Sequence, residues 1–88
     1  MWYVYVLYSV QSGKTYVGFS NDLDRRLFEH NVSEQRGFTL RYRPWTLIHS
    51  EAYETKQKAM AHEKFLKTGK GRELVKEIVA KFLDSQAR

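Results

Sequence analysis

The sequence contains no cysteine among its 88 residues, which excludes disulfide bonds and thiolate metal sites. It also lacks a hydrophobic run that could span a bilayer, because the apolar N-terminal stretch ends after residue 10. No basic region precedes this stretch and no small-residue cleavage site follows it, so it does not have the pattern of a secretion signal. We therefore expect a soluble, cytoplasmic protein with no membrane partner.

Internal repeats, low-complexity segments and domain linkers are also missing from the sequence. A chain of 88 residues has the length of one domain. At this size folding buries roughly 60–65% of the surface of the unfolded chain, which leaves a modest core. The length therefore predicts a single domain over residues 1–88.

Positive charge is in excess, with 15 lysine and arginine residues against 10 acidic residues and a formal net charge of +5. The resulting positive field favours polyanions such as nucleic acids, although the same balance also serves solubility. Six of the aromatic residues are tyrosines. Tyrosine rings fill a core or stack on nucleotide bases, and their hydroxyls are available for chemistry.

Three segments have the composition of β-strands. Residues 2–9 are continuously apolar, which is typical of a central strand covered on both faces. A tight turn at residues 11–14 leads to a second strand over 15–19. A third strand is predicted over 45–53, with Trp45, Leu47 and His49 on one face and Ile48 on the other.

Three helices are predicted around these strands. The first follows an N-cap at Ser20 or Asn21 and runs to about His30. The second is capped by Thr55 and runs to about Lys67. After a break at Gly69 and Gly71, a third helix covers residues 72–83, and residues 31–43 are expected to be a loop. The fold class is thus α+β, a small three-stranded antiparallel sheet flanked by helices in the order β-β-α-β-α-α.

Polar side chains occupy the inward stripe of the first predicted helix. Helical spacing forms this stripe from Leu23, Arg26, Leu27 and His30. Arginine is seldom buried without a partner. Either Arg26 and His30 lie at the wet edge of a narrow stripe, with their apolar stems covering the core, or they are retained for function.

The second predicted helix has a carboxylate in its apolar stripe. This stripe is formed by Ala59, Met60, Glu63 and Leu66. An ionised, unpaired carboxylate in such a position costs several kcal/mol. Two explanations stay open: Glu63 forms an internal salt bridge with Arg26, or it binds a hard cation.

Tyr5 and Tyr16 lie in the two strands of the predicted hairpin, where they are close to opposite each other. Together with Arg26, His30 and Glu63 they form a set that suits phosphodiester hydrolysis. A cation at Glu63 would polarise the phosphoryl group, and Arg26 would stabilise the charge that develops on it. A tyrosine or His30 would help to deprotonate water. A single carboxylate favours one metal ion over two.

These residues resemble the GIY-YIG nuclease domain family, which has two tyrosine-containing strand motifs. The motifs read Tyr3-Val4-Tyr5 and Tyr16-Val17-Gly18 here, and Tyr5 and Tyr16 are eleven positions apart as in the family. The family arginine follows ten residues later and matches Arg26, a histidine four residues further on matches His30, and the glutamate of a later helix matches Glu63. The resemblance covers essentially the whole chain, and it is greatest to the small stand-alone bacterial members.

The resemblance implies an endonuclease that cleaves DNA with Mg²⁺ or Mn²⁺. It implies that Glu63 binds the metal and that Arg26 stabilises the transition state. Tyr5 and Tyr16 are the candidates for positioning or activating water, and His30 would assist in proton transfer or phosphate binding. Which tyrosine assists the nucleophile stays open.

A non-catalytic nucleic-acid-binding module of the same fold is the alternative interpretation. Exposed aromatic residues such as Phe38, Tyr42 or Trp45 would then stack on bases, and affinity would fall steeply with salt. In either interpretation RNA stays open as a ligand beside DNA, and a targeting protein partner would supply the specificity that so short a chain lacks. The phosphate-binding candidates in the C-terminal half are Lys64, Lys67, Lys70, Arg72 and Lys76.

Overall fold

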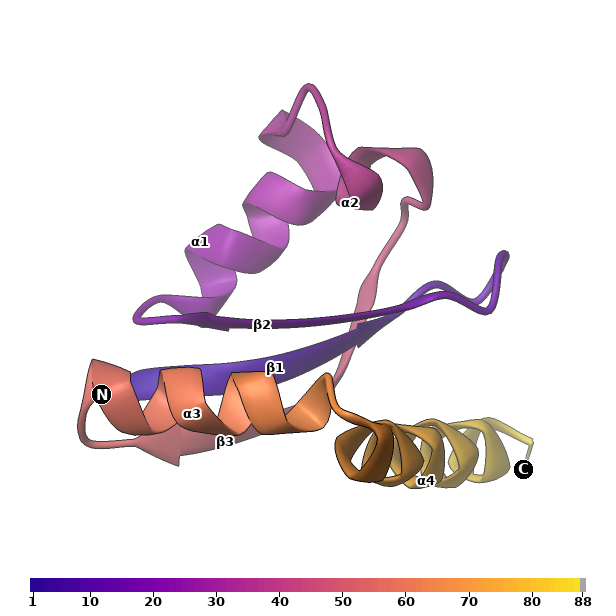
Figure 1. The fold of residues 1–88 in the computed structure, drawn as a ribbon. Helices are drawn as coiled ribbons and strands as arrows, with labels where there is room; N and C mark the ends of the chain where they lie inside the picture. Colours follow the sequence, from indigo (N-terminus) through magenta and orange to yellow (C-terminus); the bar gives the residue numbers. More distant parts are fainter. Residues whose placement is uncertain (88) are drawn as a thin grey trace.

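A computed structural model describes residues 1–87 as a three-stranded antiparallel sheet with helices on both faces, which confirms the predicted α+β class (Figure 1). None of the helices in this part of the chain is both long and apolar enough to cross a membrane. The elements in chain order are β1 (Trp2–Tyr8), β2 (Thr15–Ser20), α1 (Leu23–Phe28), the π-helical turn η1 (Glu29–Ser33), α2 (Phe38–Arg41), β3 (Thr46–Tyr53), α3 (Lys56–Leu66) and α4 (Gly69–Gln86).

The first strand is the central one, as its continuous hydrophobicity predicts. The strand order is β2-β1-β3, with α1 and α2 on one side of the sheet and α3 and α4 on the other (Figure 1). Val4 and Val6 belong to the hydrophobic cluster on the side of α3 and α4. Tyr5 and Leu7 alternate with them and pack into a second cluster on the side of α1. Burial on both faces therefore fixes the central position of β1.

A β-bulge in β3 makes the prediction for His49 wrong. Val6 pairs with His49 whereas the next residue, Leu7, pairs with Leu47, so Ile48 is an extra residue in β3. One inserted residue reverses the alternation of side chains between the two faces. Leu47 consequently packs in the cluster on the α1 side, while His49 lines a hollow formed with α3 and α4.

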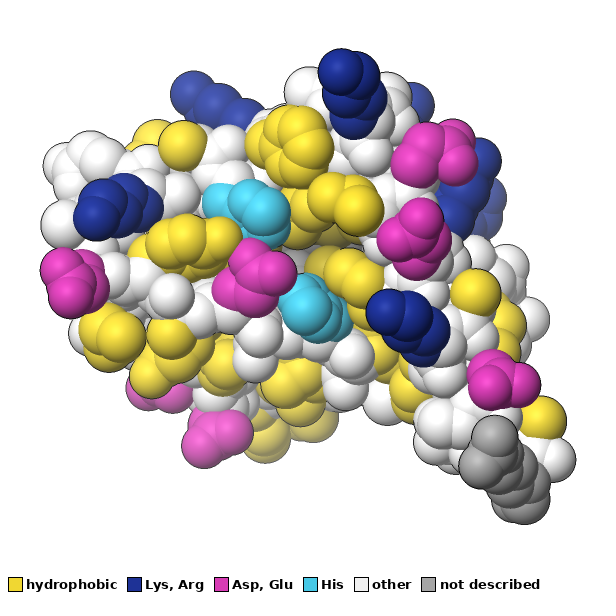
Figure 2. Space-filling view, turned by 90° about the horizontal axis from the view of Figure 1, so that it is seen from below, with side chains coloured by type: hydrophobic (Ala, Val, Ile, Leu, Met, Phe, Trp, Pro, Cys, Tyr) yellow, Lys and Arg dark blue, Asp and Glu magenta, His cyan; other side chains and the backbone are white. Residues whose placement is uncertain are grey.

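His49 belongs to a polar cluster that connects β3 to α3. Its Nε2 atom lies 3.1 Å from Oε1 of Glu51, and Nε2 of His62 lies 2.9 Å from Oε2 of the same carboxylate. Figure 2 shows this face, turned away from α1, with histidine and acidic side chains gathered among hydrophobic ones. Because His62 comes from α3 and Glu51 from β3, their contact helps to hold α3, which also carries Glu63, against the sheet.

Residues 31–43 are more ordered than the loop that we expected. The π-helical turn η1 extends to Ser33, and α2 follows it. The Arg43 side chain donates hydrogen bonds to the backbone carbonyls of Glu29, His30 and Glu34. The Arg43 side chain thus stabilises a polar turn that lies nine or more residues earlier in the chain. A local sequence pattern does not reveal this long-range contact.

The N-cap of α1 lies later than predicted. It is Asp22, whose Oδ1 accepts a hydrogen bond at 3.0 Å from the backbone N–H three residues on. Ser20, one of the two expected caps, instead accepts a hydrogen bond from the Asp22 backbone. The other predicted cap is confirmed: the Thr55 hydroxyl accepts from the third following backbone N–H at 3.2 Å. Both caps satisfy amide groups that helix geometry leaves without partners.

The break between the last two helices is shorter than predicted. Thr68 caps α4 by accepting from the backbone N–H of Gly71, so that the helix starts at Gly69 and includes both glycines that we expected to interrupt it. A Cβ atom at Gly71 would collide with the backbone of Leu66. This glycine therefore permits a close approach of α4 to the end of α3.

Candidate active site

A hydrogen bond between two buried side chains forms the centre of the site. The Tyr5 hydroxyl on β1 lies 2.9 Å from Nε2 of His30 in the π-helical turn η1. Tyr5 is 2% exposed and His30 is 1% exposed. Two strongly polar groups are thus held together inside the fold, and π-helical turns of this kind are frequent at functional sites.

Glu34 favours one tautomer of the His30 imidazole. Its Oε2 atom lies 3.4 Å from Nδ1 of His30, which is buried and has no hydrogen-bond partner among residues 1–87. The carboxylate favours the imidazole tautomer with its proton on Nδ1, so that Nε2 accepts the proton of the Tyr5 hydroxyl. Burial, with the charge of Arg26, lowers the pKa of His30, and burial, reinforced by Tyr16, raises the pKa of Tyr5. The pair is therefore neutral near neutral pH.

Sequence reasoning did not select Glu34, which organises the site. Arg26 forms an ion pair with its Oε1 at 3.0 Å, and the Thr39 hydroxyl donates to its Oε2. Although burial acts in the opposite direction, the hydrogen bond from Thr39 and the neighbouring His30 and Arg26 lower the pKa of Glu34. Its position four residues after His30, directly after the last residue of η1, is the signal that would have revealed it.

Arg26 is partly buried, with 31% of its side chain exposed. Its Nη1 atom lies 3.0 Å from carboxylate oxygens of both Glu29 and Glu34. Burial opposes its charge, but the hydrogen bond to Glu29 raises its pKa and keeps it protonated. Both ion pairs engage Nη1, and the guanidinium also interacts with the Tyr5 hydroxyl, which leaves part of its five N–H donors for another acceptor. The alternative of an internal salt bridge between Arg26 and Glu63 is wrong, since Glu63 is paired with Lys67.

Tyr16 joins the cluster from β2. Its ring meets the His30 ring edge-on with centroids 4.9 Å apart, and it lies 6.3 Å from the Tyr5 ring. The two tyrosines are diagonal neighbours rather than directly opposite, because Tyr16 pairs with Leu7 in the sheet. Tyr16 is partly exposed whereas Tyr5 is buried, so Tyr16 is the tyrosine within reach of solvent.

Gly18 leaves the space that the Tyr5 ring occupies. It lies directly opposite Tyr5 in the sheet. A Cβ atom at this position would lie 2.5 Å from the Tyr5 hydroxyl oxygen and 2.7 Å from Cζ of the same ring. The glycine of the second strand motif is therefore required by the first tyrosine, a relation that the sequence alone did not reveal.

Glu63 approaches from α3, near the edge strand β2. Only 15% of its side chain is exposed, and its Oε2 accepts from Lys67 Nζ at 2.9 Å. Lys67 Nζ also lies 6.0 Å from the centroid of the Tyr16 ring. The lysine thus links Glu63 to the cluster of Tyr5, Tyr16, Arg26 and His30.

A divalent cation fits Glu63 only if most of its ligands are not protein groups. Within residues 1–87, no three acidic, histidine or cysteine side chains converge as a preformed metal cage. Mg²⁺ is commonly bound through one or two carboxylates together with waters and substrate phosphates. The ion pair of Glu63 with the half-exposed Lys67 is weak enough to be exchanged. The donor set therefore fits a cation that arrives with water and phosphate oxygens.

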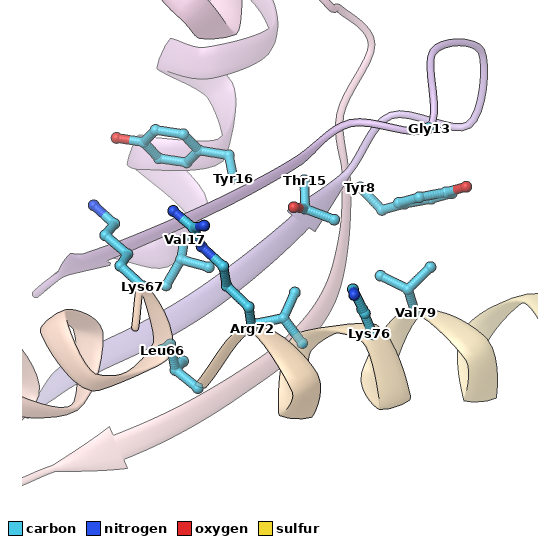
Figure 3. Close-up of a pocket in the computed structure, with 11 residues that line it drawn as sticks. Tyr8, Gly13, Thr15, Tyr16, Val17, Leu66, Lys67, Arg72, Lys76 and Val79 are labelled. Atoms are coloured by element: carbon cyan, nitrogen blue, oxygen red, sulfur yellow. The ribbon is translucent and has the colours of Figure 1, made fainter. Parts of the chain in front are cut away.

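A basic groove runs between β2 and the helices α3 and α4 (Figure 3). Its volume is about 650 Å³, and Lys67, Arg72 and Lys76 supply its cations. Lys64 and Lys70, the other predicted phosphate-binding residues, are exposed but do not line it. The remaining lining residues are Tyr8, Gly13, Thr15, Tyr16, Val17, Leu66, Val75 and Val79. Positive side chains above an apolar floor suit a phosphate backbone with its sugars and bases.

Comparisons with known proteins identify the family and similar proteins. The GIY-YIG catalytic domain family matches residues 1–76. A UPF0213 protein of Bacillus pumilus is 39% identical over 75% of this chain and 66% of its own length. UPF0213 protein VNG_2274C of Halobacterium salinarum is 36% identical over 72% of this chain and 80% of its own length. The solution NMR structure of UPF0213 protein BH0048 from Bacillus halodurans has 28% identity and a TM-score of 0.51, covering 89% of this chain and 85% of that one.

Proposed function

Because the chain belongs to the GIY-YIG catalytic domain family, which implies a nucleic-acid substrate, we propose that it is a metal-dependent endonuclease that hydrolyses DNA phosphodiester bonds. The observation that carries this proposal is the buried, neutral Tyr5–His30 pair beside Arg26. A protein interior does not need this arrangement for stability, since apolar residues of similar volume would pack there at lower cost. The cluster also adjoins a basic groove through Tyr16.

The groove supports binding of the phosphate backbone. Arg72 and Lys76 are one helical turn apart on α4, and Lys67 lies nearer to Tyr16. Cations in a row displace the counterions of a polyanion, and this provides affinity without sequence preference. In our proposal these three residues bring a phosphodiester to Tyr16 and Arg26.

The side chains then divide the work of hydrolysis. Tyr16, the accessible hydroxyl, positions the attacking water, and the free N–H groups of Arg26 bind the non-bridging oxygens. The water oxygen forms the new bond to phosphorus while the bond to the leaving ester oxygen breaks. The proton that the water loses passes through the Tyr5 hydroxyl to Nε2 of His30. Glu34 stabilises the resulting imidazolium from Nδ1, and the leaving oxygen takes a proton from solvent.

Glu63 is the residue that would hold the divalent cation, Mg²⁺ or Mn²⁺. When bound, such a cation supplies positive charge to the phosphoryl oxygen and to the leaving group. Lys67 would exchange its ion pair with Glu63 for a contact with phosphate. The cation would then replace Lys67 as the positive partner of the Glu63 carboxylate.

The experiment that tests the proposal compares Glu63→Gln with Glu54→Gln. Glu54 is exposed and lies just before α3, away from the residues that line the groove, so its substitution controls for a lost surface charge. We expect Glu63→Gln to cut labelled DNA at least about 100-fold more slowly in Mg²⁺ or Mn²⁺, with an unchanged circular dichroism spectrum. Glu54→Gln should cut at the rate of the unmodified protein. Equal rates for all three proteins would refute the assignment of Glu63.

The basic groove by itself also favours a second candidate function, a nucleic-acid-binding module without catalysis. Lys67, Arg72 and Lys76 would bind phosphate whether or not the neighbouring side chains react. Binding that weakens as salt rises, with no product from any DNA or RNA in the presence of metal, would support this second function over the first.

A further inference from the structure

An aromatic surface adjoins the candidate active site, and hydrolysis does not require it. Phe38 on α2 is 47% exposed, and its ring lies 4.8 Å from that of Tyr42 and 5.9 Å from that of Trp45. We call these three residues the α2 platform. The Phe38 ring is also stacked on Tyr16, with centroids 6.5 Å apart and an interplanar angle of 25°. The platform therefore continues directly from a side chain of the site.

The platform is fixed before any ligand arrives. The expectation that Trp45 is exposed and stacks on bases is wrong, because Trp45 is 3% exposed; its indole N–H donates to the Thr39 backbone carbonyl at 2.7 Å, and it supports Phe38 from within the core. The Asn31 side chain accepts from the Trp45 backbone N–H at 2.6 Å and donates to its carbonyl at 3.0 Å. Phe38 thus rests on a rigid base, and a ligand that stacks on it need not order the segment first.

Positive charge surrounds the platform from two separate segments. Lys14 Nζ, from the turn between β1 and β2, lies 5.7 Å from the centroid of the Tyr42 ring. The guanidinium of Arg41 lies 5.9 Å from the same ring. An aromatic face flanked by cations is complementary to a nucleotide, which has a flat base and an adjacent phosphate.

We infer that the α2 platform stacks an unpaired nucleobase. This base belongs to the nucleic-acid strand whose scissile phosphate lies beside Tyr16. This inference rests on the proposed function and specifies its substrate. A base inside a duplex is covered on both faces by its neighbours, whereas a base in a single strand or at a branch can present a face to Phe38. The preferred substrate is therefore a nucleic-acid strand with an unpaired nucleotide beside the scissile phosphate.

The test measures binding in EDTA, where cleavage does not interfere. Labelled single strands, intact or abasic at one position each, are compared with a duplex of the same sequence. Base stacking on an aromatic residue is worth roughly a 5- to 150-fold change in affinity, so Phe38→Ala should weaken binding of the intact single strand by this factor. Phe38→Trp should retain binding and Phe38→Leu should not, since only the former keeps an aromatic face.

A matched control is Phe28→Ala, because Phe28 on α1 is 58% exposed and belongs to neither hydrophobic cluster. The affinity of the Phe28→Ala protein for the single strand should equal that of the unmodified protein. One abasic position should weaken binding to the unmodified protein but not to Phe38→Ala. Duplex affinity should be the same for all variants.

Several results would overturn the inference. Equal single-strand affinity of Phe38→Ala and Phe28→Ala would refute base stacking, and so would full retention of binding by Phe38→Leu. Equal loss of single-strand and duplex binding would assign Phe38 a structural role instead. If one of these results is found and the unmodified protein still cleaves DNA, base stacking is refuted and the proposed function stands. Absence of both cleavage and binding would refute both proposals.

Discussion

Gly18→Ala provides a sharp test of how the site is built, because the substitution adds one methyl group opposite Tyr5. The new Cβ would lie 2.5 Å from the Tyr5 hydroxyl oxygen and 2.7 Å from Cζ. Neither distance is tolerable, so the Tyr5 ring must move and its hydrogen bond to His30 must lengthen or break. Since β2 and β1 pair on both sides of Gly18, the backbone has little freedom to yield.

The expected cost follows from two effects. Overfilling a packed core costs typically about 1–3 kcal/mol. Leaving a buried polar group without its partner costs about 1–3 kcal/mol more. We therefore expect Gly18→Ala to lower the free energy of unfolding by roughly 2–6 kcal/mol, and the Tm by about 10 °C or more for a domain of this length. DNA cleavage should fall as well, although Gly18 contacts no substrate in our account.

Thermal unfolding followed by circular dichroism measures this cost, in a double-mutant cycle with Tyr5→Phe. Tyr5→Phe removes the oxygen that the new methyl group would meet first and has already lost the hydrogen bond to His30. Gly18→Ala should therefore cost at least about 1 kcal/mol less in the Tyr5→Phe protein than in the unmodified one. Additive effects of the two substitutions, or a Tm of Gly18→Ala within about 2 °C of the unmodified protein, would refute the packing argument.

Three further predictions concern charge. Arg72→Ala should reduce the slope of log K against log salt for DNA binding by about one. Lys70→Ala, outside the groove, should change the slope less. Equal slopes for the two variants in fluorescence anisotropy titrations would contradict phosphate binding in the groove. Because burial holds the pKa of His30 below its usual 6.5, the unfolded state gains the proton first, so the free energy of unfolding should fall as pH drops through 6.5. Urea titrations should show a shallower fall for His30→Gln, and parallel pH profiles would argue against a neutral buried imidazole. Although burial opposes it, hydrogen bonds from Tyr53 and His49 lower the pKa of Glu51, so its stabilising effect should be present above pH 4.5 and lost as pH falls through the lowered pKa. Since the Glu51 side chain is 40% exposed, Glu51→Gln should lower the free energy of unfolding by less than about 1 kcal/mol near neutral pH. A larger loss in urea titrations would mean that the contact of Glu51 with His62 of α3 stabilises the fold more than its exposure implies.

Helical periodicity predicted the features that depend on local geometry. Arg26 and His30 lie on the inward stripe of α1 and its π-helical continuation, and Glu63 lies with Leu66 on that of α3, because side chains three and four residues apart share a face. The central position of β1 followed from its unbroken hydrophobicity. These predictions needed no knowledge of distant parts of the chain.

The features that depend on distant pairing were not predictable in this way. The His49 side chain lies on the face of the sheet opposite to the predicted one, because β3 has one extra residue in its pairing with β1. The sequence of β3 does not indicate this bulge. Glu34 fell in a segment whose polarity indicated a loop, although the Arg43 side chain orders it. Which lysines face the groove depends on the short break at Lys67 and on the early start of α4 at Gly69.

The most direct measurement of the central claim is cleavage of labelled DNA by the unmodified protein, in Mg²⁺ or Mn²⁺ and again in EDTA. The substrates are a duplex, a single strand, a flap and a four-way junction of related sequence. The account predicts products in the presence of either metal and none in EDTA, with faster cleavage of the substrates that contain unpaired nucleotides. Absence of product from every substrate in both metals, despite binding that weakens as salt rises, would contradict the nuclease and favour the binding module.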